Sequence, residues 1–414
     1  MGQGVASMSR WGIGRQLGAA ALFAAFVSTR SLSSFYPLFD ILGPATPQGE
    51  IYESYAALQV VTALLLIGIL AAHKPLAPLL CKRWLVVFAA GCGTCGALAL
   101  LAGQALGWTF FGILGLLLMA VYPALYLPTV GLRLSKLDLR DACVVVAVTF
   151  AFAELYRFLF LLVPAGGAAS IFLFPLVAGA VVTLLPPAEE GSAKAAQKDR
   201  NVSGTESSSP TGTNAILLFT SAALLCILSA IFSRLLSNPT IDSIAFDERA
   251  LTLYATIVVF ISLAIVVRFA PLSIDTLTLL YAFCAFVFLT ALTSTVFLAF
   301  QGITANGVAL LKTTQRIFEA FIMTSIFFIV KNTRISPVTA FSLYGIFVIA
   351  VLNLLSNGIA APANQFFEIY QSPQVIPMTA LVTLFSLIAI SATLAAIFLR
   401  RSKEHQVTAK EYNS

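Results

Sequence analysis

Apolar runs of about 20 residues, the length that crosses a bilayer as a helix, recur along the whole chain. One set precedes residue 187 and a second set follows residue 213. The first set lies near residues 14–36, 52–72, 84–104, 107–130, 141–163 and 167–186, and the second near 214–236, 250–269, 275–299, 305–330, 336–357 and 375–399. This pattern predicts an all-α polytopic membrane protein with twelve spanning helices in two bundles of six.

A polar segment separates the two sets. Residues 187–213 are rich in Ser, Thr, Gly and charged residues, and such a composition buries too little apolar surface to fold by itself. We therefore expect an N-terminal six-helix bundle at 11–186, a flexible cytoplasmic linker at 187–213, a C-terminal six-helix bundle at 214–400 and a cytoplasmic tail at 401–414.

Composition agrees with a membrane protein. Of the 414 residues, 59% are hydrophobic and only 10% are charged, whereas soluble domains carry about 25% charged residues. The mean hydropathy is +0.94. Lipid must solvate most of such a chain, which disfavours a soluble enzyme or a nucleic-acid-binding protein.

Lys and Arg are unevenly distributed between the loops. If both termini are cytoplasmic, the inner segments collect eighteen Lys and Arg residues and the outer loops collect Arg249 alone. Because cytoplasmic loops of membrane proteins are enriched in Lys and Arg, we expect a multi-pass protein of the inner or plasma membrane with both termini in the cytoplasm.

Seven ionisable side chains lie inside the predicted spans, where lipid does not solvate charge. A central Arg or Lys costs about 2.5–3.5 kcal/mol against lipid, so these groups must face one another or an enclosed, hydrated space. The two bundles are therefore expected to surround a central cavity. The seven residues are Arg30, Glu154, Arg157, Arg234, Lys312, Arg316 and Glu319.

The spacing of these charges predicts shared helix faces. Glu154 and Arg157 are three residues apart, and Lys312, Arg316 and Glu319 follow one another by four and then three residues. One interpretation is that these groups are structural ion pairs. Two carboxylates do not neutralise five cations, however, so the interior keeps a net charge of +3, and an organic anion is a natural counter-charge for arginine.

Two further features leave alternatives open. Tyr122 and Tyr126 share a face of the fourth predicted helix, where they either contact the body of a substrate or pack the bundle. The "CGTC" sequence at 92–95 has a redox spacing, but it lies in a Gly- and Ala-rich helix, which favours close helix packing.

A short sequence match links the two sets of helices. "TRSLSS" from Thr29 matches "SRLLSN" from Ser233, which sets Arg30 opposite Arg234 in the first helix of each set. Both arginines would lie toward the outer ends of their helices, so the alternative for them is snorkelling to the interface.

Two sets of six helices, cytoplasmic termini and a long cytoplasmic connector resemble the major facilitator superfamily. The paired Arg on the first and seventh helices is similar to the arrangement in organophosphate:phosphate exchangers of that superfamily, where two guanidinium groups hold the anionic substrate. The segment after the second helix, "GILAAHKPLAPLLCKRW", is basic but lacks the Asp of the family signature.

These features predict a secondary active transporter of a small organic anion, either a carboxylate or a phosphate ester, working by alternating access as a symporter or antiporter. Substrate-binding candidates are Arg30, Arg157, Arg234, Lys312, Arg316, Tyr122 and Tyr126; Glu154 and Glu319 are candidates for proton coupling or ion pairing. Because His73 and His405 lie outside the spans, we expect no enzyme activity, no cofactor and no metal site.

The alternative function is a non-transporting membrane receptor on a transporter scaffold. It would signal ligand binding to a separate regulatory protein, because the residues after Leu399 are too few for a DNA-binding domain. Under either hypothesis the partners are a small anionic solute and the lipid bilayer, and not nucleic acid.

Overall fold

The computed structural model describes residues 12–29, 48–162, 166–187, 210–236, 246–269, 273–300, 304–333, 335–360, 363 and 375–412. In the first half the helices are α1 (Ile13–Thr29), α3 (Gln48–Ala71), α4 (His73–Leu80), α5 (Arg83–Leu106), α6 (Thr109–Leu134), α7 (Leu139–Leu162) and α8 (Gly166–Gly179), which continues as η2 (Ala180–Thr183). In the second half they are α10 (Pro210–Leu235), α11 (Phe246–Phe269), α12 (Ile274–Phe300), α13 (Thr304–Asn332), α14 (Pro337–Gly345) with the π-helical segments η3 (Ile346–Val351) and η4 (Leu354–Ala360), and α16 (Val375–Tyr412).

Apart from the short helix α4, the described helices fall on the twelve predicted spans. Eight of them are long and apolar enough to cross a membrane, and the bent pair α3–α4 makes a ninth if it is counted as one span. Shorter apolar helices cover the other three predicted spans, at Ile13–Thr29, Phe172–Thr183 and Thr256–Phe269. The all-α prediction is therefore confirmed for the part of the chain that the structure describes.

The second predicted span does not end in a simple loop. The chain turns at Ala72, and α4 runs at 100° to the end of α3. The ring nitrogen Nδ1 of His73 lies 2.9 Å from the carbonyl oxygen of Leu70 at this corner. Pro75 is in the first turn of α4, where proline is tolerated because its missing N–H has no partner within the helix. The basic segment after α3 therefore forms the short helix α4.

Glycines set the closest approach between α5 and α6. A Cβ added to Gly103 would stand 2.6 Å from the backbone nitrogen of Gly112, and one added to Gly96 would stand 2.7 Å from that of Met119. Cys92 and Cys95 lie on α5 as free thiols, the first buried and the second exposed. Small residues therefore serve helix packing here, as the sequence predicted.

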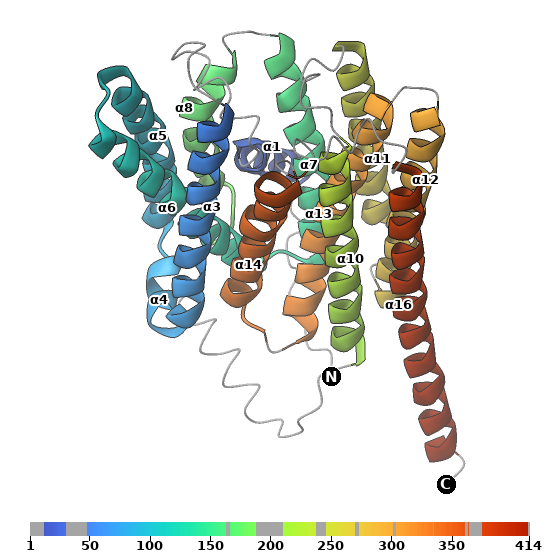
Figure 1. The fold of residues 1–414 in the computed structure, drawn as a ribbon. Coiled ribbons are helices and arrows are strands. Elements are labelled where there is room, and N and C mark those ends of the chain that lie inside the picture. The colour runs from blue at the N-terminus through green and yellow to red at the C-terminus, as the bar shows by residue number, and fades with distance from the viewer. Residues whose placement is uncertain are drawn as a thin grey trace, which may run out of the picture.

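The two halves pack along central helices. α7 contacts α11 and α13, and α14 contacts α3 and α6. Figure 1 shows α7, α13, α10 and α14 near the middle, with α5 on one flank and α16 on the other. The C-terminal helix continues to Tyr412 through residues that the sequence pattern assigns to a tail, and at ~1.5 Å per residue it is about 57 Å long.

Most of the described Lys and Arg residues that lie near helix ends are at one end of the bundle, which we call the basic end. It is the end where α5 and α7 begin and where α6, α11 and α13 finish, and α4 lies beside it in Figure 1. Its cations are Lys82, Arg83, Arg133, Lys136, Arg140, Arg268 and Lys331.

Candidate functional site

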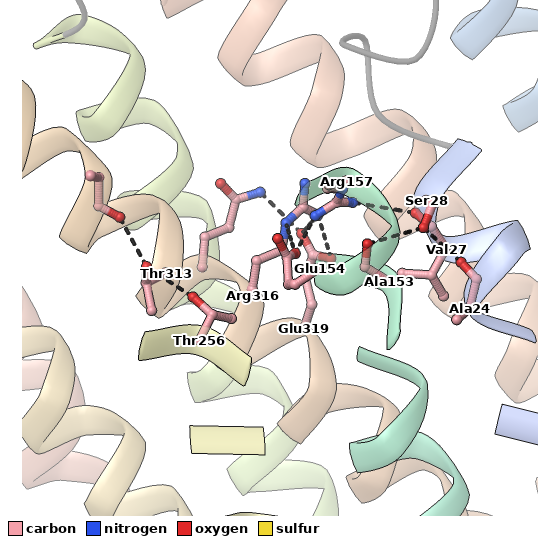
Figure 2. A network of polar contacts seen from close by, with 12 residues as sticks. Ala24, Val27, Ser28, Ala153, Glu154, Arg157, Thr256, Thr313, Arg316 and Glu319 are labelled. Atoms are coloured by element: carbon pink, nitrogen blue, oxygen red, sulfur yellow. Dashed lines mark hydrogen bonds and ion pairs between the residues drawn. The ribbon is translucent and has the colours of Figure 1, made fainter. Parts of the chain in front are cut away.

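Four charged side chains meet between α7 and α13, and we call them the ion network: Glu154, Arg157, Arg316 and Glu319 (Figure 2). The Glu154 and Glu319 side chains are only 7% and 2% exposed, while those of Arg157 and Arg316 are 16% and 22% exposed. Charges this buried persist only when they are paired and hydrogen-bonded. Four of the seven predicted interior charges therefore face one another.

Within each helix the pairs have the predicted spacing. Arg157 Nη1 donates to Glu154 Oε1. On α13, Arg316 Nη1 donates to both oxygens of Glu319, at 3.1 and 3.0 Å, and Gln315 Nε2 donates to Glu319 Oε1 at 3.0 Å. Each half therefore contributes one carboxylate that is already neutralised by an arginine of its own helix.

One ion pair of the network crosses from one half to the other. Arg316 Nε lies 3.7 Å from Glu154 Oε1, which also accepts from Arg157. This is the longest contact of the network, and it is the one that a relative movement of the halves would break. Glu154 is thus shared between an arginine of its own helix and an arginine of the opposite half.

Helix α1 borders the network through its backbone. Arg157 Nη2 donates to the carbonyl oxygen of Val27 at 3.4 Å. Ser28 Oγ donates to the carbonyl oxygens of Ala24 and Ala153, at 2.9 and 3.2 Å, which ties α1 to α7 beside Glu154 (Figure 2). These contacts were not predictable from the sequence, because they depend on which helices are neighbours.

The network lies well inside the membrane-spanning region. At ~1.5 Å per residue, Glu154 is about 22 Å along α7 from Leu139, and Arg316 is about 24 Å along α13 from Asn332. Both helix ends belong to the basic end. The two halves therefore place their charges at the same depth.

Two of the remaining predicted cations, Lys312 and Arg234, lie farther from the basic end. Lys312 is half-buried one turn beyond Arg316 on α13. Arg234 is in the last turn of α10, about 36 Å from Pro210 at ~1.5 Å per residue. There its charge complements the negative C-terminal end of the helix, and it stands about 12 Å beyond the ion network by the same spacing. Arg30 lies outside the described residues.

The two tyrosines belong to the packing of the first half. Their rings contact Phe26, with centroid distances of 5.6 Å for Tyr122 and 4.6 Å for Tyr126. Tyr126 Oη donates to the carbonyl oxygen of Ala178 at 2.9 Å. Both side chains are buried among α1, α6 and α8, an arrangement in which they support the bundle.

The ion network holds both predicted interior carboxylates and two of the five predicted interior cations. With two cations and two carboxylates, it is neutral as a unit. The other predicted cations are Lys312 and Arg234, which lie outside the network, and Arg30, which lies outside the described residues. Lys312 and Arg234 lie on the side of the network away from the basic end.

The fold can be compared with those of known proteins. No family model matches the sequence, and no curated protein shows significant similarity to it. Among solved structures, the major facilitator superfamily transporter FucP in its outward conformation aligns over 94% of this chain and 99% of its own, with 14% identity and a TM-score of 0.54. A single-residue variant of the E. coli fucose:proton symporter FucP aligns over the same shares of the two chains, with 13% identity and a TM-score of 0.54.

A bacterial homologue of the iron transporter ferroportin, in its outward-facing state, aligns over 94% of this chain and 99% of its own, with 18% identity and a TM-score of 0.55. These alignments cover both halves of the molecule, and the helices that they match are those of multi-pass membrane proteins. The chain therefore has the fold of the major facilitator superfamily transporters.

Proposed function

We propose that this protein is a secondary transporter that carries a small organic anion, a carboxylate or a phosphate ester, by alternating access. The observation that carries the proposal is the Arg316–Glu154 ion pair, which joins the two halves deep inside the span at 3.7 Å. Transporters of this architecture bind solutes at the interface of their two repeats and move by rocking one repeat against the other.

The anionic character of the solute is inferred from the arginines. Arg157 and Arg316 come from opposite halves and converge on Glu154. Because a guanidinium presents a planar fork that fits carboxylate and phosphate, a solute anion between them would take the place of Glu154. Lys312 and Arg234 lie farther from the basic end, where their charge would attract an anion toward the network.

Replacement of Glu154 by the solute suggests a coupling step. When both arginines turn to the solute, Glu154 loses its main counter-charges. Because its side chain is only 7% exposed, water does not replace them. A buried carboxylate without a counter-charge binds a proton. Glu154 is therefore our candidate for proton coupling, and Glu319 keeps its hydrogen bond from Gln315.

We infer that the protein lies in an inner or plasma membrane and that both of its termini face the cytoplasm. The support is the basic end, which gathers the described loop cations and is also the end at which α16 finishes. On this assignment Lys312 and Arg234 lie toward the outside, and a solute from outside would meet them before the ion network.

Uptake into proteoliposomes tests the proposal. The purified protein would be assayed with labelled succinate, lactate, glucose 6-phosphate and glycerol 3-phosphate, and with labelled fucose as a neutral control. Saturable uptake of at least one anion, without uptake of fucose, is the expected result. Uptake of fucose with no uptake of any anion would contradict the anionic assignment.

The same preparation separates a transporter from a receptor. Anion binding raises the unfolding midpoint, and above Kd the stabilisation grows with the logarithm of the ligand concentration, whether or not the solute crosses the membrane. Stabilisation by an anion together with flux supports transport, whereas stabilisation without flux would favour a receptor that passes its signal to a separate regulatory protein.

A further inference from the structure

The basic end holds a second charged contact between the halves, far from the ion network. Asp141 lies in the first turn of α7, and its side chain is 8% exposed. Its Oδ1 accepts from Gln16 Nε2 of α1 at 2.7 Å and from Arg268 Nη1 of α11 at 3.4 Å. Gln16 thus fixes the carboxylate within its own half, and Arg268 reaches it from the other half.

The helix termini strengthen this contact. Asp141 is at the N-terminal end of α7, and Arg268 is in the last turn of α11. A carboxylate is favoured at a helix N-terminus and a cation at a C-terminus. The two opposite helix ends and the two opposite charges therefore attract one another across the boundary between the halves.

The adjoining boundary is only partly filled by side chains. A cavity of about 330 Å³ lies between α7 and the C-terminal half, and it is lined by Asp138, Ser273, Phe328, Lys331 and Asn332. Packing alone is incomplete in this region. The Asp141–Arg268 pair adds to the packing of α7 against α11 beside this cavity.

A steric contact closes the boundary on its other side. Phe341 of α14 is fully buried, and its ring covers Gly131 of α6 so closely that a Cβ at Gly131 would overlap the ring carbon Cγ. The ring also meets Phe327 edge-on, with centroids 5.5 Å apart. Gly131 lies three residues before the end of α6 and Phe341 lies in the second turn of α14, so this contact is also at the basic end.

We propose that these two contacts form a clasp that holds the basic end shut. The clasp consists of the Asp141–Arg268 ion pair on one side and the Phe341 ring over Gly131 on the other. Both must separate when the halves rock to open this end. The inference rests on the proposed alternating access, but it requires neither an anionic solute nor a role for the ion network.

Distance measurements between spin labels test the clasp without any solute. Labels would be placed at Lys74→Cys on α4 and at Leu399→Cys on α16, which are exposed positions of opposite halves, in a variant whose native cysteines are replaced. Double electron–electron resonance in lipid nanodiscs then reports how far the halves are apart at the basic end. The labelled protein with an intact clasp should give mainly the short-distance population.

Asp141→Asn should raise the ratio of long- to short-distance populations about tenfold, the value expected for ~1.4 kcal/mol from a partly buried pair. The charge-exchanged variant Asp141→Arg/Arg268→Asp should return part of the short population. Gly131→Ala is an independent test that leaves the ion pair intact, and it should open the same end because the ring of Phe341 must move. Arg83→Gln, an exposed arginine at the same end, is the matched control and should change nothing.

Unchanged distance distributions in both Asp141→Asn and Gly131→Ala, with native circular dichroism and a monodisperse elution profile, would overturn the clasp. That outcome would leave the transport proposal standing, because solute flux is measured separately. Conversely, an opened basic end in these variants would support the clasp even if no tested anion were transported.

Discussion

The substitution Glu319→Gln probes how the ion network stabilises the protein. The carboxylate is 2% exposed and accepts two hydrogen bonds from Arg316 and one from Gln315. At an effective dielectric constant of about 20, unit charges 3.0 Å apart attract each other by about 5.5 kcal/mol before any desolvation is counted. Loss of the charge leaves Arg316 with one carboxylate, Glu154, at 3.7 Å.

The net loss of stability is smaller than this attraction. Removing one partner of a fully buried pair costs about 3–5 kcal/mol. Water reaches Arg316, whose side chain is 22% exposed, and Glu154 still offers it a partial counter-charge. We therefore expect Glu319→Gln to lower the free energy of unfolding by about 2–3 kcal/mol. The double variant Arg316→Gln/Glu319→Gln should be at least ~1 kcal/mol more stable than the single variant, because the Glu154–Arg157 pair that remains is neutral.

Titration with sodium dodecyl sulfate in mixed micelles measures these differences. The free thiols of Cys143, Cys226 and Cys284 are buried, so their reactivity with a maleimide reports unfolding alongside circular dichroism. Asp138→Asn, which removes an exposed carboxylate, is the control and should change stability by less than ~0.5 kcal/mol. A double variant that is less stable than Glu319→Gln would refute the idea that an uncompensated Arg316 is the cause of the loss.

Three further predictions concern packing, a buried cation and the arginine fork. Gly103→Ala should cost about 2 kcal/mol because its Cβ would meet Gly112 at 2.6 Å, whereas Gly91→Ala, with nothing within 4 Å, should be neutral in the same titration. Arg133→Gln should cost about 2 kcal/mol, since this fully buried guanidinium donates to a carbonyl oxygen at 2.7 Å; an unchanged midpoint would show that the contact is dispensable. Arg157→Lys should reduce anion uptake at least ~10-fold at normal protein yield, because an ammonium keeps the charge and loses the planar fork; wild-type uptake would argue for a purely electrostatic role.

The helices were predictable because each one needs a long apolar run. The pairs within one helix, Glu154–Arg157 and Arg316–Glu319, were also predictable, since residues three apart share a helix face. The Arg316–Glu154 pair was not, because it depends on α7 lying beside α13. The bend at Ala72 was missed because the apolar segments on both sides of it read as one span followed by a loop.

The assignment of Arg234 to the substrate site depended on where its helix ends. The sequence predicts that the seventh span ends at residue 236, and α10 ends at Leu235, so Arg234 lies in the terminal turn and its place in a substrate site stays a prediction. The contact of Asp141 was not predicted, because Arg268 is distant from it in sequence. Its position in the first turn of a predicted helix was the available signal. The domain boundaries at 187–213 remain predictions.

Counterflow of one transported anion in variants of the ion network tests the central claim most directly. Proteoliposomes loaded with unlabelled anion would be diluted into a trace of the labelled form, which removes any need for a proton gradient. The account predicts strong transient accumulation for the wild type and for Arg400→Gln, an exposed arginine on α16, and almost none for Arg157→Gln or Arg316→Gln. Wild-type counterflow in both network variants would contradict it.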